Sequence, residues 1–159
     1  MPQTAGAPAG AVSLQICGGT DHVAAVNPAE DIPRKDHFIN VHGVICAGRH
    51  FIIDLFGASH LDDQERMEAA MREAVRVAGA TLLHIHLHVF EPNGGLSGVA
   101  VLAESHVSVH TWPENNYAAF DVFMCGEARP ELTVAVFEEA FSPERVGVRE
   151  LLRGVASSD

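Results

Sequence analysis

The sequence has few cysteines, and none of them lies in a paired motif. Cys17, Cys46 and Cys125 are the only three in 159 residues, and no two of them form a C-x-x-C pair. An odd count without such a pair argues against a disulfide framework and against a zinc site built on cysteines. Reduced thiols are the rule in the cytoplasm. The sequence therefore predicts a cytoplasmic protein.

Basic residues are scarce as well. Lys and Arg together number 10 against 21 Asp and Glu, which gives a formal net charge of -11. Binding of nucleic acid depends on clustered Lys and Arg, so this balance argues against such a partner. No apolar run reaches the roughly 20 residues of a membrane-spanning helix, and the N-terminus lacks the pattern of a secretion signal. We therefore expect neither a nucleic-acid partner nor a membrane.

The length and composition fit one folded domain with an extension in front of it. A chain of 159 residues with 47% hydrophobic content can bury its own core. Residues 1–42 are rich in Ala, Gly and Pro, and Asn27-Pro28 and Ile32-Pro33 interrupt regular structure there. We interpret residues 1–42 as a flexible N-terminal arm and residues 43–159 as the folded domain.

Hydrophobic periodicity predicts both helices and strands in that domain. Apolar residues from Met67 to Ala78 recur at helical spacing, after Asp62 and Asp63 as possible N-caps and before Gly79 as a stop. A second helix is expected to begin at Pro130. Strands are expected at 51–56, 81–90, 97–103, 105–112, 117–125 and 146–152. Helices against one face of a mostly antiparallel sheet make an α+β two-layer sandwich.

Histidines alternate with apolar residues in the strand expected at 81–90. His84, His86 and His88 would face one side of the sheet, and the apolar residues between them, Leu83, Ile85, Leu87 and Val89, the other. Side chains two residues apart on a strand lie roughly 6–7 Å apart, a spacing that can seat a metal. A polar sheet face that lines an interface or a pocket explains the pattern more simply. We therefore assign no metal.

The densest group of reactive side chains lies in one stretch, Glu104-Ser105-His106-Val107-Ser108-Val109-His110-Thr111-Trp112-Pro113-Glu114. Gly48-Arg49-His50 and Leu96-Ser97-Gly98 precede it, and a strand that ends in Cys125-Gly126 follows it. Together these segments resemble the processing site of prokaryotic S-adenosylmethionine decarboxylases. The resemblance covers about residues 43–153. It implies the two-layer fold of that family.

The resemblance also implies a chain that cleaves itself. In this family a serine hydroxyl attacks the carbonyl of the preceding glutamate, so we expect cleavage between Glu104 and Ser105 into a 1–104 fragment (the beta chain) and a 105–159 fragment (the alpha chain). His110 matches the base that then removes the serine α-proton, a task that suits imidazole near neutral pH. Ser97 matches a serine that assists processing. Loss of ammonia leaves residue 105 as a pyruvoyl group, the cofactor.

A pyruvoyl group implies decarboxylation of an amino acid. Its ketone forms a Schiff base with the substrate amine and accepts the electrons left when carbon dioxide departs. Cys125 matches the acid that returns a proton, and Glu114 the carboxylate that binds the ribose hydroxyls. Phe90 and Trp112 are candidate aromatic faces for the adenine. The implied product is decarboxylated S-adenosylmethionine for spermidine synthesis, and the implied assembly is a homodimer of cleaved protomers.

The same residues have simpler explanations. Cys125, Phe90 and Trp112 could be core residues, and Ser105 and His110 could be polar residues on a solvated sheet face. A further alternative is a non-catalytic binding or metal-carrying module on the same fold, which an uncleaved chain with bound metal would support. This non-catalytic alternative stays open beside the decarboxylases.

Departures from the usual family pattern lie close to the substrate positions. Asn115-Asn116 stands where Tyr-Gly or His-Gly is more usual, and Gly94-Gly95 lengthens the loop before Ser97. A pyruvoyl-dependent decarboxylase of ornithine or arginine is therefore the second alternative. Glu114 and Trp112 favour S-adenosylmethionine, because a free amino acid has neither ribose nor adenine.

Overall fold

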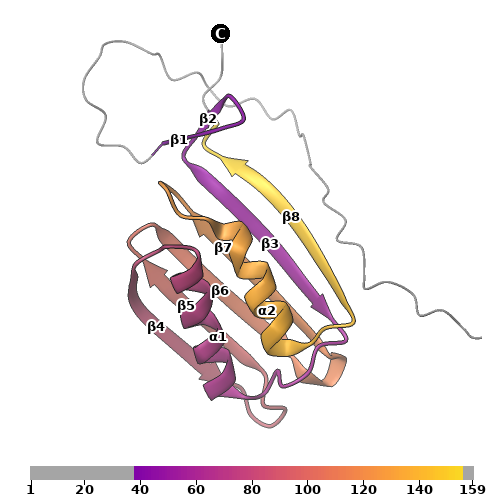
Figure 1. Ribbon diagram of the computed structural model, residues 1–159. Helices are drawn as coiled ribbons and strands as arrows, with labels where there is room; N and C mark the ends of the chain where they lie inside the picture. The colour runs from indigo at the N-terminus through magenta and orange to yellow at the C-terminus, as the bar shows by residue number, and fades with distance from the viewer. Residues whose placement is uncertain (1–37, 156–159) are drawn as a thin grey trace, which may run out of the picture.

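The computed structural model describes residues 38–155, so most of the predicted N-terminal arm (1–42) lies outside the described residues. The elements in chain order (Figure 1) are β1 (Ile39–Val41), β2 (Val44–Cys46), β3 (Gly48–Phe56), α1 (Gln64–Val77), β4 (Leu82–Val89), β5 (Leu96–Leu102), β6 (Ser105–Trp112), η1 (Pro113–Asn115), β7 (Tyr117–Met124), η2 (Pro130–Leu132), α2 (Thr133–Phe141) and β8 (Arg145–Arg153). Within this part of the chain, no helix is long and apolar enough to cross a membrane.

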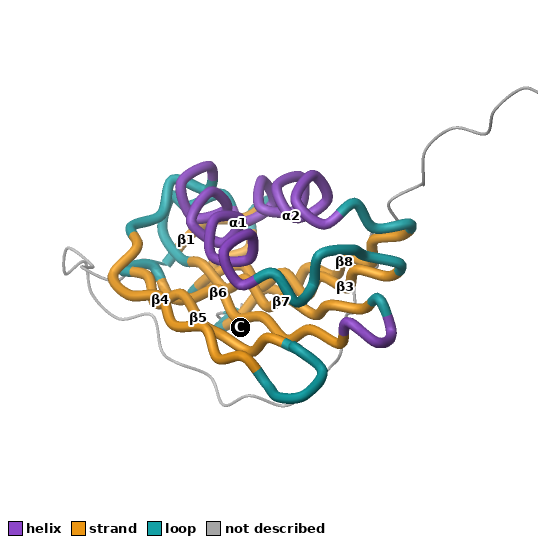
Figure 2. The backbone as a smooth tube through the Cα atoms, turned by 90° about the horizontal axis from the view of Figure 1, so that it is seen from below, coloured by secondary structure: helices purple, strands orange, loops and turns teal. Residues whose placement is uncertain are grey.

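One six-stranded sheet organises the domain. Its strand order is β4-β5-β6-β7-β3-β8, and every neighbouring pair is antiparallel. Both helices lie on the same side of this sheet (Figure 2). The predicted α+β two-layer sandwich is confirmed. A small β1–β2 hairpin precedes the sheet.

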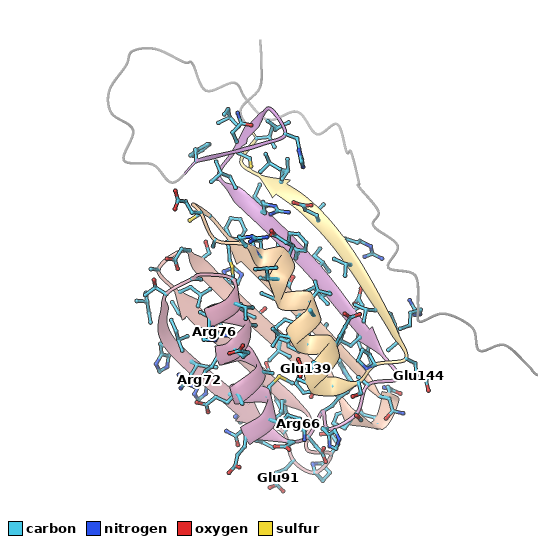
Figure 3. The ribbon with its side chains drawn as sticks, viewed as in Figure 1. Arg66, Arg72, Arg76, Glu91, Glu139 and Glu144 are labelled. Atoms are coloured by element: carbon cyan, nitrogen blue, oxygen red, sulfur yellow. The ribbon has the colours of Figure 1, made fainter. Side chains whose placement is uncertain are left out.

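Each helix packs through the residues that its periodicity brings to one face. The Asp63 side chain caps α1 by accepting a hydrogen bond from the Arg66 N–H at 3.0 Å. Met67 and Met71 then point into the core with no exposed surface. Residues on the opposite face of α1 pair with each other at the surface, such as Arg72 with Glu68 (Figure 3).

The prediction for one side of β4 is partly wrong. Leu87 is buried and Val89 pairs with the buried Leu96, as expected for the side that faces the core, but Leu83 is 63% exposed. The pairing register shifts between Leu82 and His84, which marks a β-bulge. A bulge inserts an extra residue and breaks the strict alternation of faces. Leu83 therefore points away from the core.

The sheet face opposite the helices is polar and aromatic. Cross-strand partners share a face, and the register aligns one row across five strands: His88, Ser97, His110, Ala119 and Asp54. Beyond the row that contains His86 and Ser108, a further row on this face holds His84, Val101, His106, Phe123 and His50. A third row holds Trp112, Tyr117, Phe56 and Arg145. No element of the described chain covers these rows (Figure 2), so we call this surface the open face.

Candidate active site

The turn between β5 and β6 carries the predicted cleavage position. Glu104 and Ser105 lie where the chain reverses, with Leu102 paired to Ser105 across the turn. The Glu104 carbonyl oxygen accepts two hydrogen bonds from Cys125, one from its N–H at 3.0 Å and one from its Sγ at 3.2 Å. Two donors on one carbonyl oxygen polarise that carbonyl and are placed to stabilise negative charge on it.

The backbone at Ser105 adopts a rare conformation. Its φ angle is 138°, in a region that residues other than glycine seldom occupy. Such a conformation is unfavourable by about 1–3 kcal/mol and persists only when the surrounding structure fixes it. Functional sites often contain backbone of this kind. The predicted self-processing serine is therefore held in a strained position beside the polarised Glu104 carbonyl.

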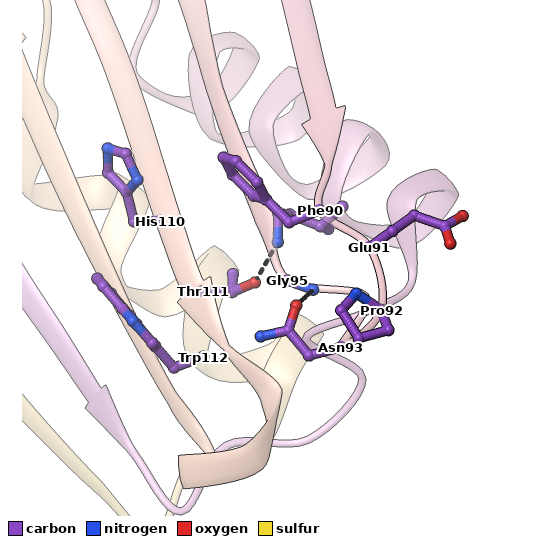
Figure 4. Close-up of a pocket in the computed structure, with 9 residues that line it drawn as sticks. Phe90, Glu91, Pro92, Asn93, Gly95, His110, Thr111 and Trp112 are labelled. Carbon is purple, nitrogen blue, oxygen red and sulfur yellow. Dashed lines mark hydrogen bonds between the residues drawn. The ribbon is translucent and has the colours of Figure 1, made fainter.

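The other end of β6 borders an open pocket of about 500 Å³ (Figure 4). His110 and Trp112 line it from β6, and Phe90 faces them from the loop after β4. Trp112 is 38% exposed and Phe90 is 49% exposed. These exposed fractions exclude the alternative that the two aromatic residues belong to the core. They leave apolar ring surface available to a planar ligand.

Trp112 is supported from behind by a second aromatic ring. The Tyr117 ring stacks on it with centroids 5.3 Å apart and an interplanar angle of 29°. The Tyr117 hydroxyl donates a 2.6 Å hydrogen bond to Asp54. Burial, followed by this bond to a carboxylate, raises the pKa of Tyr117 to about 12. The bond to Asp54 fixes the Tyr117 ring, and the stacking between the two rings in turn limits the movement of Trp112.

Glu114 lies beside the same pocket, on η1. It is exposed, and both of its carboxylate oxygens lie 3.4 Å from the Asn93 Nδ2, which donates to them. The Asn93 side-chain oxygen accepts from the Gly95 N–H at 3.3 Å (Figure 4). Asn93 thus links the pocket loop to the carboxylate predicted to bind ribose. The sequence offered no signal for this link, because the pattern around Asn93 predicts only a turn.

Ser97 and His110 are neighbours on the open face. They are direct cross-strand partners on β5 and β6. The backbones of β4 and β5 run close together here, because a Cβ added to Gly98 would lie 2.6 Å from the His86 carbonyl oxygen. Glycine therefore fits the position after Ser97. The structure thus brings together two of the residues predicted to process the chain.

The predicted residues nevertheless fall into two groups within one chain. Ser105 and Cys125 lie at one end of β6 and β7, whereas Ser97 and His110 lie toward the other end of β5 and β6. Ser105 and His110 are five residues apart on one strand. At about 3.3 Å per residue their backbones are separated by roughly 16 Å. One chain therefore does not bring its own His110 to its own Ser105.

Histidines other than His110 also populate the open face. His84, His86 and His88 are exposed, as expected for a polar sheet face. Within residues 38–155 no three His, Cys, Asp or Glu side chains are grouped so that they could hold a metal. Elsewhere on this face, burial and then the nearby His50 lower the pKa of His106. His106 is thus biased toward its neutral form.

Comparisons with known proteins agree with this arrangement. The family model for S-adenosylmethionine decarboxylase matches residues 49–154. The chain belongs to the S-adenosylmethionine decarboxylase family. A "S-adenosylmethionine decarboxylase proenzyme" of Thermomicrobium roseum is 46% identical over 109 residues, which are 68% of this chain and 94% of the relative. The proenzyme of Methanococcus maripaludis strain S2 is 47% identical over 111 residues, 68% of this chain and 90% of the relative.

A solved structure supports the fold of this family member. The crystal structure of the adenosylmethionine decarboxylase from Aquifex aeolicus VF5 matches with a TM-score of 0.61 at 30% identity. The match covers 70% of this chain and 94% of that chain. The predicted family, fold and class of enzyme, a pyruvoyl-dependent carboxy-lyase, are confirmed. The β1–β2 hairpin (39–46) precedes the family match.

Proposed function

We propose that this chain is a self-processing decarboxylase of S-adenosylmethionine, with Ser105 as the precursor of its pyruvoyl group. The observation that carries the proposal is the double hydrogen bond from Cys125 to the Glu104 carbonyl oxygen. It supplies donors at the oxygen where negative charge must develop if the neighbouring hydroxyl attacks. A hydroxyl adjacent to its own peptide bond is the nucleophile that this reaction requires.

The processing reaction balances on groups of the chain itself. The Ser105 hydroxyl oxygen bonds to the Glu104 carbonyl carbon, the peptide C–N bond breaks, and the hydroxyl proton moves to the released amine. A base then removes the Ser105 α-proton, the bond between Cβ and the ester oxygen breaks, and Glu104 leaves with a free carboxylate. The dehydroalanine rearranges to an imine, to which water adds with loss of ammonia. Imidazole is suited to the α-proton step, so we assign it to His110.

The residues around Ser105 fit the resulting group. A pyruvoyl ketone supplies an electrophilic carbonyl that bonds to a substrate amine and accepts the electrons released with carbon dioxide. Cys125 lies beside this position, through its contact with Glu104, and we assign it the return of a proton to the substrate α-carbon. This role requires a reduced thiol, which is why a cytoplasmic location stays part of the proposal.

The two fragments would remain one folded unit after cleavage. Fragment 105–159 supplies β6, β7 and β8, while fragment 1–104 supplies β3, β4 and β5. β3 pairs with β7 on one side and with β8 on the other. One strand of the first fragment is thus enclosed by two strands of the second. Separating the fragments would break the sheet and expose the core beneath it.

The pocket at the far end of β6 is our assignment for the nucleoside. Trp112 and Phe90 offer the exposed rings on which a base can stack, and Glu114 offers a carboxylate for two ribose hydroxyls. The relatives reported above are named for S-adenosylmethionine, so ornithine or arginine as substrate is not favoured. A non-catalytic module is not favoured either, because the processing residues are all present.

We further propose a homodimer in which the open faces of two protomers pack together. A two-fold axis that lies between the two sheets, perpendicular to β6 and level with Val107 and Ser108, would reverse the partner strand, and packed sheets lie about 10 Å apart. Ser105 of one protomer would then lie opposite His110 and Ser97 of the partner subunit. Each site would thereby gain the base that its own chain holds roughly 16 Å away. Packing would also cover Trp112 and Val101, which are exposed on this face.

Denaturing mass spectrometry of the purified protein tests the processing. The expected result is two fragments split between Glu104 and Ser105, with the second lighter than its encoded mass by one ammonia, because the serine amine is lost. A single chain that stays intact after long incubation at neutral pH would overturn the proposal. Release of carbon dioxide from S-adenosylmethionine, compared with ornithine and arginine, then tests the substrate.

A further inference from the structure

Thr81 binds the cleavage turn from the side opposite Cys125. It lies just before β4, and its N–H donates to Glu104 Oε2 at 2.8 Å. Its hydroxyl donates to Glu104 Oε1 at 3.2 Å. Its carbonyl oxygen accepts from the Ala103 N–H at 3.0 Å. All three polar groups of Thr81 are therefore bonded to the two residues that form the turn.

The turn is consequently fixed at both ends of Glu104. The carboxylate is held by Thr81 and the carbonyl oxygen is held by Cys125. With its side chain and its carbonyl both anchored, Glu104 has little freedom to rotate its peptide plane. This double attachment also accounts for the positive φ of 138° at Ser105, since strained backbone persists only where the surroundings fix it.

We propose that Thr81 is a positioning residue for self-cleavage, acting through the Glu104 carboxylate to orient the Glu104 carbonyl toward the Ser105 hydroxyl. The inference rests on the proposed function, because it assumes that cleavage occurs at this peptide bond. Intramolecular attack needs the reacting atoms about 3–3.5 Å apart with the carbonyl correctly aligned. Thr81 touches neither reacting atom, and its contribution is confined to the first step, the transfer of the acyl group from nitrogen to oxygen.

The test follows cleavage of newly synthesised precursor over time in Thr81→Val and Thr81→Ser. Valine has a similar shape and keeps the backbone bonds but lacks the hydroxyl, so cleavage should slow about tenfold, which corresponds to about 1.4 kcal/mol. Serine restores the hydroxyl and should cleave at close to the wild-type rate. Glu104→Ala removes both side-chain bonds and should be slower than Thr81→Val. Glu139→Ala is the matched control, because Glu139 is an exposed carboxylate on α2 (Figure 3).

Hydroxylamine identifies the step that is affected. It cleaves an ester but not a peptide, so it accelerates cleavage only where the ester accumulates. Thr81→Val should gain little from hydroxylamine, since its ester forms slowly. His110→Ala should gain much, since its ester forms but is not eliminated. The same substitutions in a Ser105→Ala background, which cannot be cleaved, should unfold at the same temperature as Ser105→Ala alone, which separates positioning from folding.

Two results would overturn the role of Thr81 while leaving the proposed function intact. One is a Thr81→Val precursor that cleaves within twofold of the wild-type rate. The other is a slow Thr81→Val precursor that hydroxylamine restores, which would place the defect after ester formation. A wild-type chain that is never cleaved would remove the proposed function and this inference together.

Discussion

Co-expression of Ser105→Ala with His110→Ala decides whether the processing site is shared between protomers. Neither variant should form a pyruvoyl group alone, because one lacks the nucleophile and the other lacks the base. In a mixed dimer, however, the intact Ser105 of the His110→Ala chain would face the intact His110 of the Ser105→Ala chain. That single site should process, whereas the second site of the same dimer lacks both groups.

The expected yield follows from the geometry of one chain and from random pairing. The separation of roughly 16 Å along β6 is far beyond the ~3 Å that proton transfer requires, so a chain cannot supply its own base. At equal expression about half of the dimers are mixed. About half of the His110→Ala chains should therefore lose ammonia at residue 105, and none of the Ser105→Ala chains.

Different affinity tags on the two variants allow mixed dimers to be isolated before mass spectrometry. Spectra of each variant expressed alone provide the baseline. Mixed dimers in which every chain remains uncleaved would refute a shared site. So would a His110→Ala chain that forms its pyruvoyl group at the wild-type rate without a partner, since the base would then come from elsewhere.

Three further predictions concern stability, substrate binding and pH. Phe137 has no exposed surface, so Phe137→Ala in the uncleavable Ser105→Ala background should lower the free energy of unfolding by about 3–5 kcal/mol. Leu83→Ala, at an exposed site, should change it by less than about 0.5 kcal/mol. Urea titration measures both losses, and equal losses would contradict the described core. Trp112→Ala should leave self-cleavage unchanged and raise KM for S-adenosylmethionine about five- to 150-fold, the equivalent of ~1–3 kcal/mol of stacking. Steady-state kinetics on fully processed enzyme measure this, and a change in kcat alone would contradict the assignment of the pocket to the adenine. The pKa of His106 is lowered in the folded protein. The unfolded chain therefore binds more protons as the pH falls through the ordinary histidine range, and the free energy of unfolding should decline there. His106→Gln should flatten this decline in urea titrations between pH 8 and roughly pH 5, and an unchanged slope would argue against a partly buried imidazole that the fold keeps neutral.

Much of the fold was predictable because it depends on local pattern. The stripe from Met67 to Ala78 and the cap at Asp63 specify α1 through contacts within a few residues. Both ends of each strand of the sheet were predicted to within three residues, since alternation and turn residues mark them. The bulge beside Leu83 was missed, because a shift in register depends on how β4 meets β5 and leaves no trace in the alternation.

The candidate site divides in the same way. The sequence by itself determined which chemical groups are present, since Glu104, Ser105, His110 and Cys125 resemble a family through their order and spacing. It also contained an unused signal, because five residues along one strand already separate Ser105 from His110 by roughly 16 Å.

Only the tertiary structure decided which of these groups meet. Cys125 reaches the Glu104 carbonyl because β6 and β7 pair in a particular register, and Thr81 reaches the Glu104 carboxylate because β4 begins beside the β5–β6 turn. Such contacts join residues more than twenty positions apart. Their formation depends on sheet order and register, which the core packing of the whole domain selects and which no short stretch of sequence encodes.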